Sequence, residues 1–302
     1  MQLDKTIAQG RWAGILRDYG LNDKQISGKH TACPLCGGND RFRFDDKDGK
    51  GTWYCNQCGA GDGYALVMKL TGGSFKDTLS EIASKVGHYP ISKTKSRDDP
   101  EKVRAQLRKI MDNATREVIN PYLANRGITV KPNVFYTNSL LHWDDGVITY
   151  HPAMLAIIQD TYGNRAAIHR TYLTATGKKA DVKSPKMLTK TVTPISGGAI
   201  RLFQHDGCLG VAEGIETACA ATQLFGVPTW AAFSASMLEA FSPPQDIKKI
   251  IIFSDNDVNF TGQNAAFSLA RRLKLQGVDV EVQIPEKPDT DWADYLAETL
   301  MG

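Results

Sequence analysis

The sequence predicts a multidomain chain of the α+β and α/β classes, with an N-terminal zinc ribbon, a mixed α/β linker subdomain and a C-terminal parallel α/β sheet. Three observations predict this. Two Cys-x-x-Cys pairs come early, a polar stretch follows, and strand-like and helical segments alternate over residues 206–302. We expect domains at 1–90, 101–205 and 206–302, with a linker at 91–100. A chain of 302 residues that is 42% apolar is large enough for several cores.

The two cysteine pairs predict one structural zinc ion. Cys33 and Cys36 are separated from Cys55 and Cys58 by 18 residues, which fits the spacing of a zinc site. Four thiolates complete a tetrahedral shell, and such a site contributes on the order of 10 kcal/mol to folding. Two disulfides are the alternative, and His30 could also replace one cysteine. The N-terminus has no apolar signal segment, so a reducing, cytoplasmic location is expected, where disulfides are rare.

The residues between the pairs predict a hairpin. Residues 39–44 alternate polar and aromatic, 45–51 form a polar turn, and 52–54 return toward the second pair. Arg41 and Arg43 lie one strand step apart on the same face. Basic side chains with aromatic neighbours such as Trp53 suit single-stranded nucleic acid. For Phe42 and Phe44 the alternative, a small core of the ribbon, is favoured.

These residues carry a family resemblance. Cys-Pro-Leu-Cys-Gly-Gly-Asn-Asp-Arg-Phe-Arg-Phe at 33–44 and Gly-Thr-Trp-Tyr-Cys-Asn-Gln-Cys-Gly-Ala-Gly-Asp-Gly at 51–63 resemble the zinc ribbon of phage and plasmid DNA primases. The similarity covers 28–90 and includes a helical stretch over 64–86. It implies that the ribbon reads the template for the initiation sequence.

The middle of the chain is basic. A helix is expected over 101–123, and strand-like runs at 153–158 and 167–173. Residues 161–205 contain eight Lys or Arg and one acid, which indicates a phosphate-binding surface. An ordinary solvated surface is the alternative for each basic residue. The candidates for binding template phosphate or an incoming triphosphate are Arg165, Arg170, Lys183, Lys186, Lys190 and Arg201.

The last part of the chain is acidic and predicts a parallel sheet with helices on both faces. Residues 206–302 contain fourteen acids and six bases. Short apolar strands are expected at 208–213, 228–233, 249–255 and 279–284, and helices at 215–224, from 236, and at 260–275, the last closed by Gly277. In such a sheet ligands bind beyond the C-terminal ends of the strands.

Acidic residues follow three of these strands. Glu213 ends the first, Asp255 and Asp257 end the third, and Asp291 and Asp294 follow the fourth. Carboxylates gathered at one edge repel each other and need a cation, and oxygen ligands suit Mg²⁺ or Mn²⁺. A lone Asp at such a position is more often a turn or a helix cap, so the prediction depends on the combination.

Two nearby residues have simpler explanations. Glu216 lies in the first turn of a predicted helix, where a carboxylate can serve only to offset the helix dipole. Trp292 is expected to pack in the core.

Glu213-Gly-Ile-Glu-Thr-Ala218 together with Asp255-Asn-Asp257 resembles the Toprim domain, which bacterial-type primases, topoisomerases and some nucleases share. The resemblance covers 206–302 and implies that Glu213 is the key acid of the first motif and that Asp255 and Asp257 bind metal. Residues 197–202 and 122–127 also resemble phage-type primases, whereas 128–195 are least similar. The position of Asp291 and Asp294 matches a later acidic motif more loosely.

The combination implies a DNA primase: template-directed synthesis of short RNA primers on single-stranded DNA from nucleoside triphosphates, by two-metal nucleotidyl transfer. Glu213 would be a metal ligand or the base for the 3′-hydroxyl group. The alternatives are a metal-dependent Toprim nuclease and a non-enzymatic DNA-binding replication factor. The chain lacks a G-x-x-x-x-G-K-[ST] motif, so a separate helicase is the expected partner. It also lacks an 18-residue apolar run, so no membrane association is expected.

Overall fold

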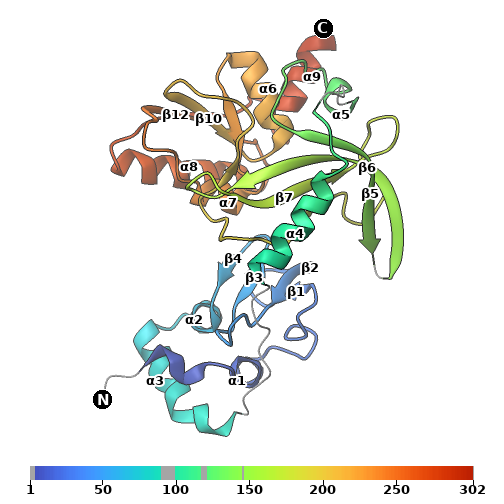
Figure 1. Cartoon of the computed structure of the whole chain (residues 1–302). Coiled ribbons are helices and arrows are strands. Elements are labelled where there is room, and N and C mark those ends of the chain that lie inside the picture. Colours follow the sequence, from blue (N-terminus) through green and yellow to red (C-terminus); the bar gives the residue numbers. More distant parts are fainter. Residues whose placement is uncertain (1–3, 90–98, 117–120, 145, 302) are drawn as a thin grey trace. The chain divides into compact units, whose positions relative to one another are not determined.

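The computed structural model describes residues 4–89, 99–116, 121–144 and 146–301. The chain forms two compact units, residues 1–98 and 99–302, which we call the first and second units (Figure 1). Residues 91–98 of the predicted linker lie outside the described residues, and Pro100 begins a helix. Among the described helices, none combines the length and apolar character that crossing a membrane requires.

The first unit is a four-stranded antiparallel sheet with helices before and after it. The sheet contains β1 (Thr31–Cys33), β2 (Gly37–Phe44), β3 (Trp53–Cys55) and β4 (Gly59–Gly61), paired in chain order. η1 (Lys5–Ala8) and α1 (Trp12–Asp18) precede it. α2 (Gly63–Thr71), α3 (Phe75–Lys85) and η2 (Val86–His88) follow it. The hairpin predicted from the sequence is therefore present.

Helices and strands of the first unit share one core. Trp12 of α1 packs among Phe42, Phe44 and Trp53 of the sheet. Gly63 lies so close to the Trp12 ring that an added Cβ would come within 2.1 Å of it, so only glycine fits there. The predicted helical stretch over 64–86 is two helices, because the chain turns at Gly72 (φ 71°) and a new helix is capped by Ser74. The ribbon is thus stabilised by packing as well as by its metal site.

The second unit is built on one nine-stranded mixed sheet, in the order β13-β12-β10-β11-β9-β6-β7-β8, with β5 paired to β6. β10 (Cys208–Ala212), β11 (Thr229–Ala231), β12 (Lys249–Phe253) and β13 (Asp279–Gln283) are parallel, as predicted. β5 (Phe135–Asp144), β6 (Val147–Gln159), β7 (Arg165–Tyr172) and β8 (Lys186–Leu188) are antiparallel.

A two-residue strand, β9 (Ala199–Ile200), joins the two halves of this sheet. Ile200 pairs with Ala231 of β11 on one side and with Ile158 of β6 on the other. A Cβ on Gly198 would lie 2.2 Å from the Gln159 carbonyl oxygen, so this position requires glycine. The basic middle of the chain and the acidic C-terminal part are therefore one hydrogen-bonded structure.

Helices cover both faces of the parallel strands, as the sequence predicts. α6 (Ile215–Phe225) and α9 (Trp292–Met301) pack on one face, where Trp292 is part of the core. α7 (Ala235–Ala240) and α8 (Thr261–Leu275) pack on the other (Figure 1).

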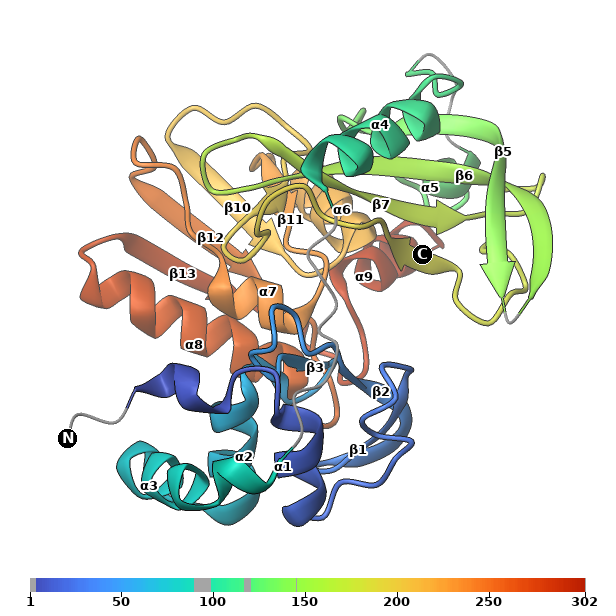
Figure 2. The same cartoon turned by 60° about the horizontal axis from the view of Figure 1, so that its bottom comes forward.

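The predicted helix over 101–123 is wrong, because the chain forms two separate helices there. α4 (Pro100–Met111) is closed by its C-cap residue Asp112, and Thr115 then exchanges backbone hydrogen bonds of 2.9 and 2.8 Å with Tyr136 of β5. α5 (Pro121–Ala124) begins at a proline. Leu107, Ile110 and Met111 of α4 pack on residues of β6 and β7, so that α4 lies across these strands (Figure 2).

Candidate functional site

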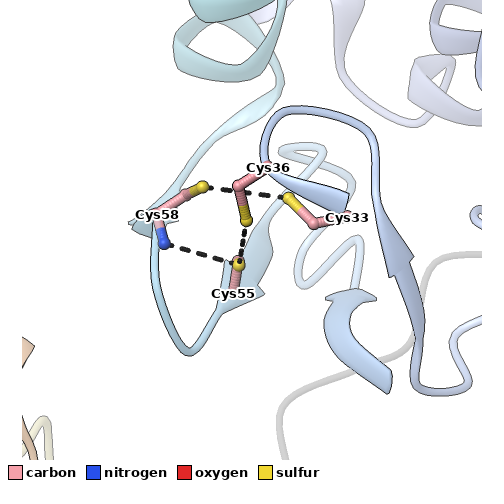
Figure 3. A group of neighbouring side chains, drawn as sticks. All are labelled: Cys33, Cys36, Cys55 and Cys58. Atoms are coloured by element: carbon pink, nitrogen blue, oxygen red, sulfur yellow. Dashed lines mark hydrogen bonds between the residues drawn. The ribbon is translucent and has the colours of Figure 1, made fainter. Parts of the chain in front are cut away.

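The four predicted cysteines converge in the first unit. Cys33 ends β1 and Cys55 ends β3, whereas Cys36 and Cys58 lie in the turns that follow these strands. The four side chains point toward one another (Figure 3). All four sulfur atoms lie within 4.8 Å of one another, with 3.7 Å between those of Cys36 and Cys55 and 3.9 Å between those of Cys33 and Cys58. Sulfurs about 2.3 Å from a tetrahedral zinc ion lie about 3.8 Å apart, so the cluster has zinc-site dimensions.

The surroundings of the sulfurs also suit zinc. The backbone N–H groups of Leu35 and Gln57 each donate to a cysteine sulfur at 3.4 Å, an interaction that favours thiolate. Burial and the neighbouring cysteines raise the pKa of Cys58, so thiolates here need a cation. The six cysteines of the chain are free, which sets the disulfide alternative aside, and His30 Nδ1 contacts the Asp40 carbonyl instead. The cysteine cluster is therefore a structural zinc site.

The two arginines that we predicted to contact nucleic acid are partly exposed, whereas the phenylalanines that alternate with them are buried. Phe42 and Phe44 are buried, and Arg41 and Arg43 lie on the opposite, partly exposed face of β2. Arg41 bonds to the Gln57 side chain, and Arg43 forms an ion pair with Asp45 at 2.7 Å.

Trp53 is a packing residue in this structure. It is 2% exposed, and its indole N–H donates to the Asp62 carbonyl at 3.0 Å. A base therefore has no exposed indole face to stack on. The sequence pattern did not show this, because the partner lies in the next loop.

Four acidic residues of the second unit follow the C-terminal ends of the parallel strands, and we call them the acidic edge: Glu213, Asp255, Asp257 and Asp291. Glu213 directly follows β10, and Asp255 lies two residues after β12. One Asp257 carboxylate oxygen accepts from the Gly262 N–H at 2.7 Å, which fixes its orientation. One Asp255 carboxylate oxygen, Oδ1, is buried without a hydrogen-bond partner among the described residues.

The carboxylates influence one another strongly. Burial, and then the charges of Glu213, Asp291 and Asp257, raise the pKa of Asp255 to about 8. Burial and the Asp257 charge raise the pKa of Glu213, and burial raises that of Asp291. The acids therefore lie within reach of one another's charges, although among the described residues no three of them bring carboxylate oxygens within 4.8 Å of one another. A divalent cation bound through oxygen would relieve the repulsion. An unpartnered buried carboxylate oxygen fits this function.

Asp291 and Asp294 have a second structural role. Asp291 Oδ1 accepts from the N–H groups of Ala293 and Asp294 at 2.7 and 2.9 Å, while Asp294 Oδ2 accepts from the Asp291 N–H at 3.2 Å. This reciprocal pair caps the first turn of α9. Asp291 also reaches inward, because Thr217 Oγ1 donates to its other oxygen at 3.3 Å, whereas Asp294 is exposed.

Glu216, for which the sequence offers two explanations, lies in a buried ion pair. It is 6% exposed, and the Lys186 ammonium lies 2.9 Å from Oε1, which also accepts from the Tyr122 hydroxyl. Burial alone would raise the pKa of Glu216, but the Lys186 charge and these two hydrogen bonds lower it to about 2. Lys186 thus joins β8 to α6, the helix that begins two residues after Glu213.

Two further polar residues of β7 lie near this pair and were missed by the sequence analysis. Burial, and then the charge of Lys186, lower the pKa of His169 to about 4, and its Nδ1 atom is buried without a described hydrogen-bond partner. Thr171 is opposite Lys186 in the sheet register, and its hydroxyl likewise has no partner among the described residues. Their positions depend on strand pairing, which no local pattern predicts.

The remaining predicted basic residues are dispersed over the second unit. Arg170 donates to the Tyr172 hydroxyl at 3.1 Å, and Arg201 lies over the Trp230 ring at 4.8 Å. Lys183 and Lys190 occupy exposed positions. Lys186, by contrast, forms an ion pair with the buried Glu216 of α6.

Arg165 lines a groove together with two arginines that the sequence analysis did not single out. Arg104 and Arg108, one turn apart on α4, line it together with Arg165 of β7. The groove has a volume of about 250 Å³, and its other lining residues are the apolar Leu107, Met111, Ile157, Ala167, Ile168 and Val192. The i, i+4 spacing on the predicted helix was the available signal. Such a basic rim attracts anions.

Comparison with known families identifies three segments. The family described as the zinc-binding domain of primase-helicase matches residues 28–64, and the Toprim domain family matches 208–301. Residues 100–202 match a domain of unknown function (DUF7146).

The chain is also similar to solved primase structures. The Aquifex aeolicus primase, with its zinc-binding and RNA polymerase domains, is 18% identical over 96% of this chain and 81% of its own, with a TM-score of 0.45. A Pseudomonas aeruginosa DNA primase domain is 14% identical over 65% and 74%, with a TM-score of 0.44. The primase fragment of the bacteriophage T7 primase-helicase is 14% identical over 90% and 97%, with a TM-score of 0.38.

The family matches coincide with the two motif sets, at the cysteine cluster and at the acidic strand ends. The chain combines the zinc-binding domain of primase-helicases with a Toprim domain, the pairing that its resemblance to phage and plasmid DNA primases implied.

Proposed function

We propose that the chain is a DNA primase that makes short RNA primers from nucleoside triphosphates on single-stranded DNA. One observation carries the proposal. Lys186 of β8 pairs with Glu216 at 2.9 Å, and its charge lowers the pKa values that burial raises at Glu213 and Asp255, two acids that follow separate parallel strands. A candidate triphosphate-binding lysine and candidate metal-binding acids of one unit therefore lie within reach of each other's charges, in a chain that also carries the zinc-binding domain of primase-helicases.

In the proposed reaction the 3′-hydroxyl oxygen of one nucleotide attacks the α-phosphorus of the next. A new oxygen–phosphorus bond forms, the bond to the β-phosphate bridging oxygen breaks, and pyrophosphate leaves. Divalent ions, when bound, stabilise the attacking and leaving oxygens. Asp255 and Asp257 would hold Mg²⁺ or Mn²⁺, with Asp291 as a further ligand.

Two residues have additional roles in this proposal. Glu213 is either a ligand or the group that accepts the hydroxyl proton, and burial raises its pKa, which makes it a stronger base than an exposed carboxylate. Lys186 would bind the triphosphate, and Arg104, Arg108 and Arg165 the template backbone.

A primer-synthesis assay tests the proposal. The protein is incubated with single-stranded DNA, labelled nucleoside triphosphates and Mn²⁺, and a ladder of new RNA is expected. A shortened template would instead establish the nuclease alternative. DNA binding without either product would establish a non-enzymatic replication factor. The double variant Asp255→Asn and Asp257→Asn should lose synthesis, and synthesis that survives it would overturn the proposed metal site.

We also propose that a separate helicase works with this chain, since tethering would raise the local concentration of a weakly binding primase. A pull-down with the replicative helicase of the same replicon tests this. Absence of a complex at micromolar concentration would argue against the partnership without affecting the primase assay.

A further inference from the structure

The loop after β12 carries two exposed apolar side chains beside the acidic edge. Val258 and Phe260 are each 70% exposed, although Asp257 precedes the first of them directly. Phe260 also has a left-handed backbone conformation, with φ 60° and ψ 19°. For a bulky residue this conformation is a genuine outlier. Exposure and backbone strain thus coincide at one aromatic residue.

Backbone hydrogen bonds hold Phe260 in this conformation. Its N–H donates to the Asp257 carbonyl at 3.0 Å, and its carbonyl accepts from the Asn264 N–H at 2.9 Å. The same turn fixes the metal-binding candidate, because the Gly262 N–H donates to the Asp257 carboxylate at 2.7 Å. The turn therefore sets the position of the Phe260 backbone relative to the Asp257 carboxylate.

Burial does not offset the strain at Phe260. Phe233, which follows β11, has the same conformation at φ 58°, but its side chain packs against the core. Phe260 leaves most of its ring in solvent, so it gains little from packing. Residues held in a strained backbone conformation cluster at active sites and at sites that clamp a ligand.

We propose that Phe260, with Val258 beside it, is a stacking platform for the base of the nucleotide whose phosphates bind at the acidic edge. This inference rests on the proposed primase function. A nucleobase offers a flat apolar face of the kind that stacks on aromatic side chains. Asp255 and Asp257 repel a nucleic-acid backbone that brings no cations, whereas the phosphates of a metal-bound nucleotide arrive with their charge compensated.

Titration calorimetry on the full zinc-loaded chain, with Mn²⁺ present, tests the platform with two ligands. ATP carries a base, and inorganic triphosphate has only the phosphates. Phe260→Asn removes the ring and keeps a residue that tolerates the left-handed conformation. Phe260→Tyr keeps the ring. Phe267→Asn is the matched control, because Phe267 is 55% exposed two turns further along α8.

Phe260→Asn should weaken ATP binding about 5- to 150-fold and leave inorganic triphosphate binding unchanged, since stacking is worth roughly that factor per base. Phe260→Tyr and Phe267→Asn should bind both ligands like the parent protein. Unchanged ATP binding in Phe260→Asn would overturn the platform. An equal loss for both ligands would also overturn it, because the ring would then act through the metal site.

Two other outcomes separate this inference from the proposed function. If the parent protein binds neither ligand with Mn²⁺, the primase proposal fails and the platform fails with it. If Phe260→Asn loses affinity for single-stranded DNA but not for ATP, the ring serves the template, and the nucleotide platform is wrong while the primase proposal stands.

Discussion

At the scale of single residues, neighbouring charges shift the pKa values of two buried carboxylates in opposite directions. Asp255 and Glu216 are both carboxylates of the same unit, yet the pKa of Asp255 is raised to about 8 and that of Glu216 lowered to about 2. Burial acts on both, and the difference lies in the neighbours. Asp255 has other acids around it, whereas Glu216 has Lys186 and Tyr122.

Asp255 predicts a pH-dependent stability of the metal-free protein. The folded state keeps the Asp255 proton up to about pH 8, whereas the unfolded chain releases it near the ordinary pKa of 3.8. This contribution to stability is therefore complete below that value and is lost as the pH rises through about 8. Asp255→Asn should be more stable than the parent at pH 9, by a margin that shrinks at pH 6, in urea unfolding.

The same residue should reverse its effect when a divalent cation is present. Mn²⁺ should stabilise the parent protein at pH 9 more than it stabilises Asp255→Asn, because the charged carboxylate then has a ligand. If the free energy of unfolding depended on pH in the same way for both proteins, with and without Mn²⁺, the Asp255 carboxylate would not lie buried among other acids.

The Lys186–Glu216 pair predicts a large effect of a single substitution. Lys186→Met leaves the buried Glu216 carboxylate with Tyr122 as its main partner, and should lower the free energy of unfolding by about 2–4 kcal/mol. Lys274→Met removes one side of an exposed ion pair with Asp279 and should change little. Denaturant unfolding of both variants at pH 7 compares them. Equal losses of unfolding free energy would mean that the buried pair contributes no more to stability than an exposed one.

At the scale of elements, short sequence patterns correctly predicted the features that depend on neighbouring residues, namely the cysteine cluster and the individual parallel strands. Cysteine spacing fixed the zinc site, because two short loops are enough to build it. The alternation of apolar runs with helical segments predicted the parallel strands, and the acids after three of these strands predicted the side of the sheet on which Glu213 and Asp255 lie. The helix over 101–123 was wrong because Thr115 pairs with Tyr136, an interaction between distant residues that outweighs a continuous apolar pattern.

What remained beyond prediction depends on the register of distant strands and on loop conformation. Lys186 pairs with Glu216, which lies 30 residues further along the chain, and Trp53 is covered by the loop that contains Asp62. The left-handed conformation of Phe260 could not be predicted from its residue type, because glycine and asparagine are the usual residues in that conformation.

The element α4 carries a testable binding surface. Arg104→Ala with Arg108→Ala should weaken single-stranded DNA binding and reduce its salt dependence, by about 0.7 in the log–log slope for each phosphate that is no longer bound. The control is Lys102→Ala with Lys109→Ala, which removes the same charge from exposed positions of α4 outside the groove. Equal effects in the two double variants, measured by fluorescence anisotropy at several salt concentrations, would show a general charge effect.

At the scale of the whole molecule, stability comes from separate sources in the two units. The first unit has a core around Trp12, Phe42 and Trp53 that encloses two of the cysteines. The second has cores on both faces of its sheet and contains no cysteine cluster among the described residues. Metal removal should therefore affect the units unequally.

Chelation of zinc, or Cys55→Ser, should unfold the first unit and leave the second folded. Zinc contributes on the order of 10 kcal/mol to such modules, which exceeds the margin of a small core. Two calorimetric transitions are expected for the zinc-loaded protein, and one should persist after chelation. Cys208→Ser is the control, because Cys208 lies in the second unit. A single transition that disappears as a whole on chelation would contradict independent folding.

The strand β9 has a consequence for dissecting this protein. The composition changes from basic to acidic at residues 205–206, so this position is an obvious place to divide the chain. A cut there would separate the two-residue strand β9 from β11, its partner in the sheet. A fragment that starts at 206 would leave β11 without its β9 neighbour, and the backbone groups of Thr229–Ala231 would face water as an open sheet margin. Such a piece is expected to self-associate, so truncated versions are better designed to keep residues 199–200 with the acidic half.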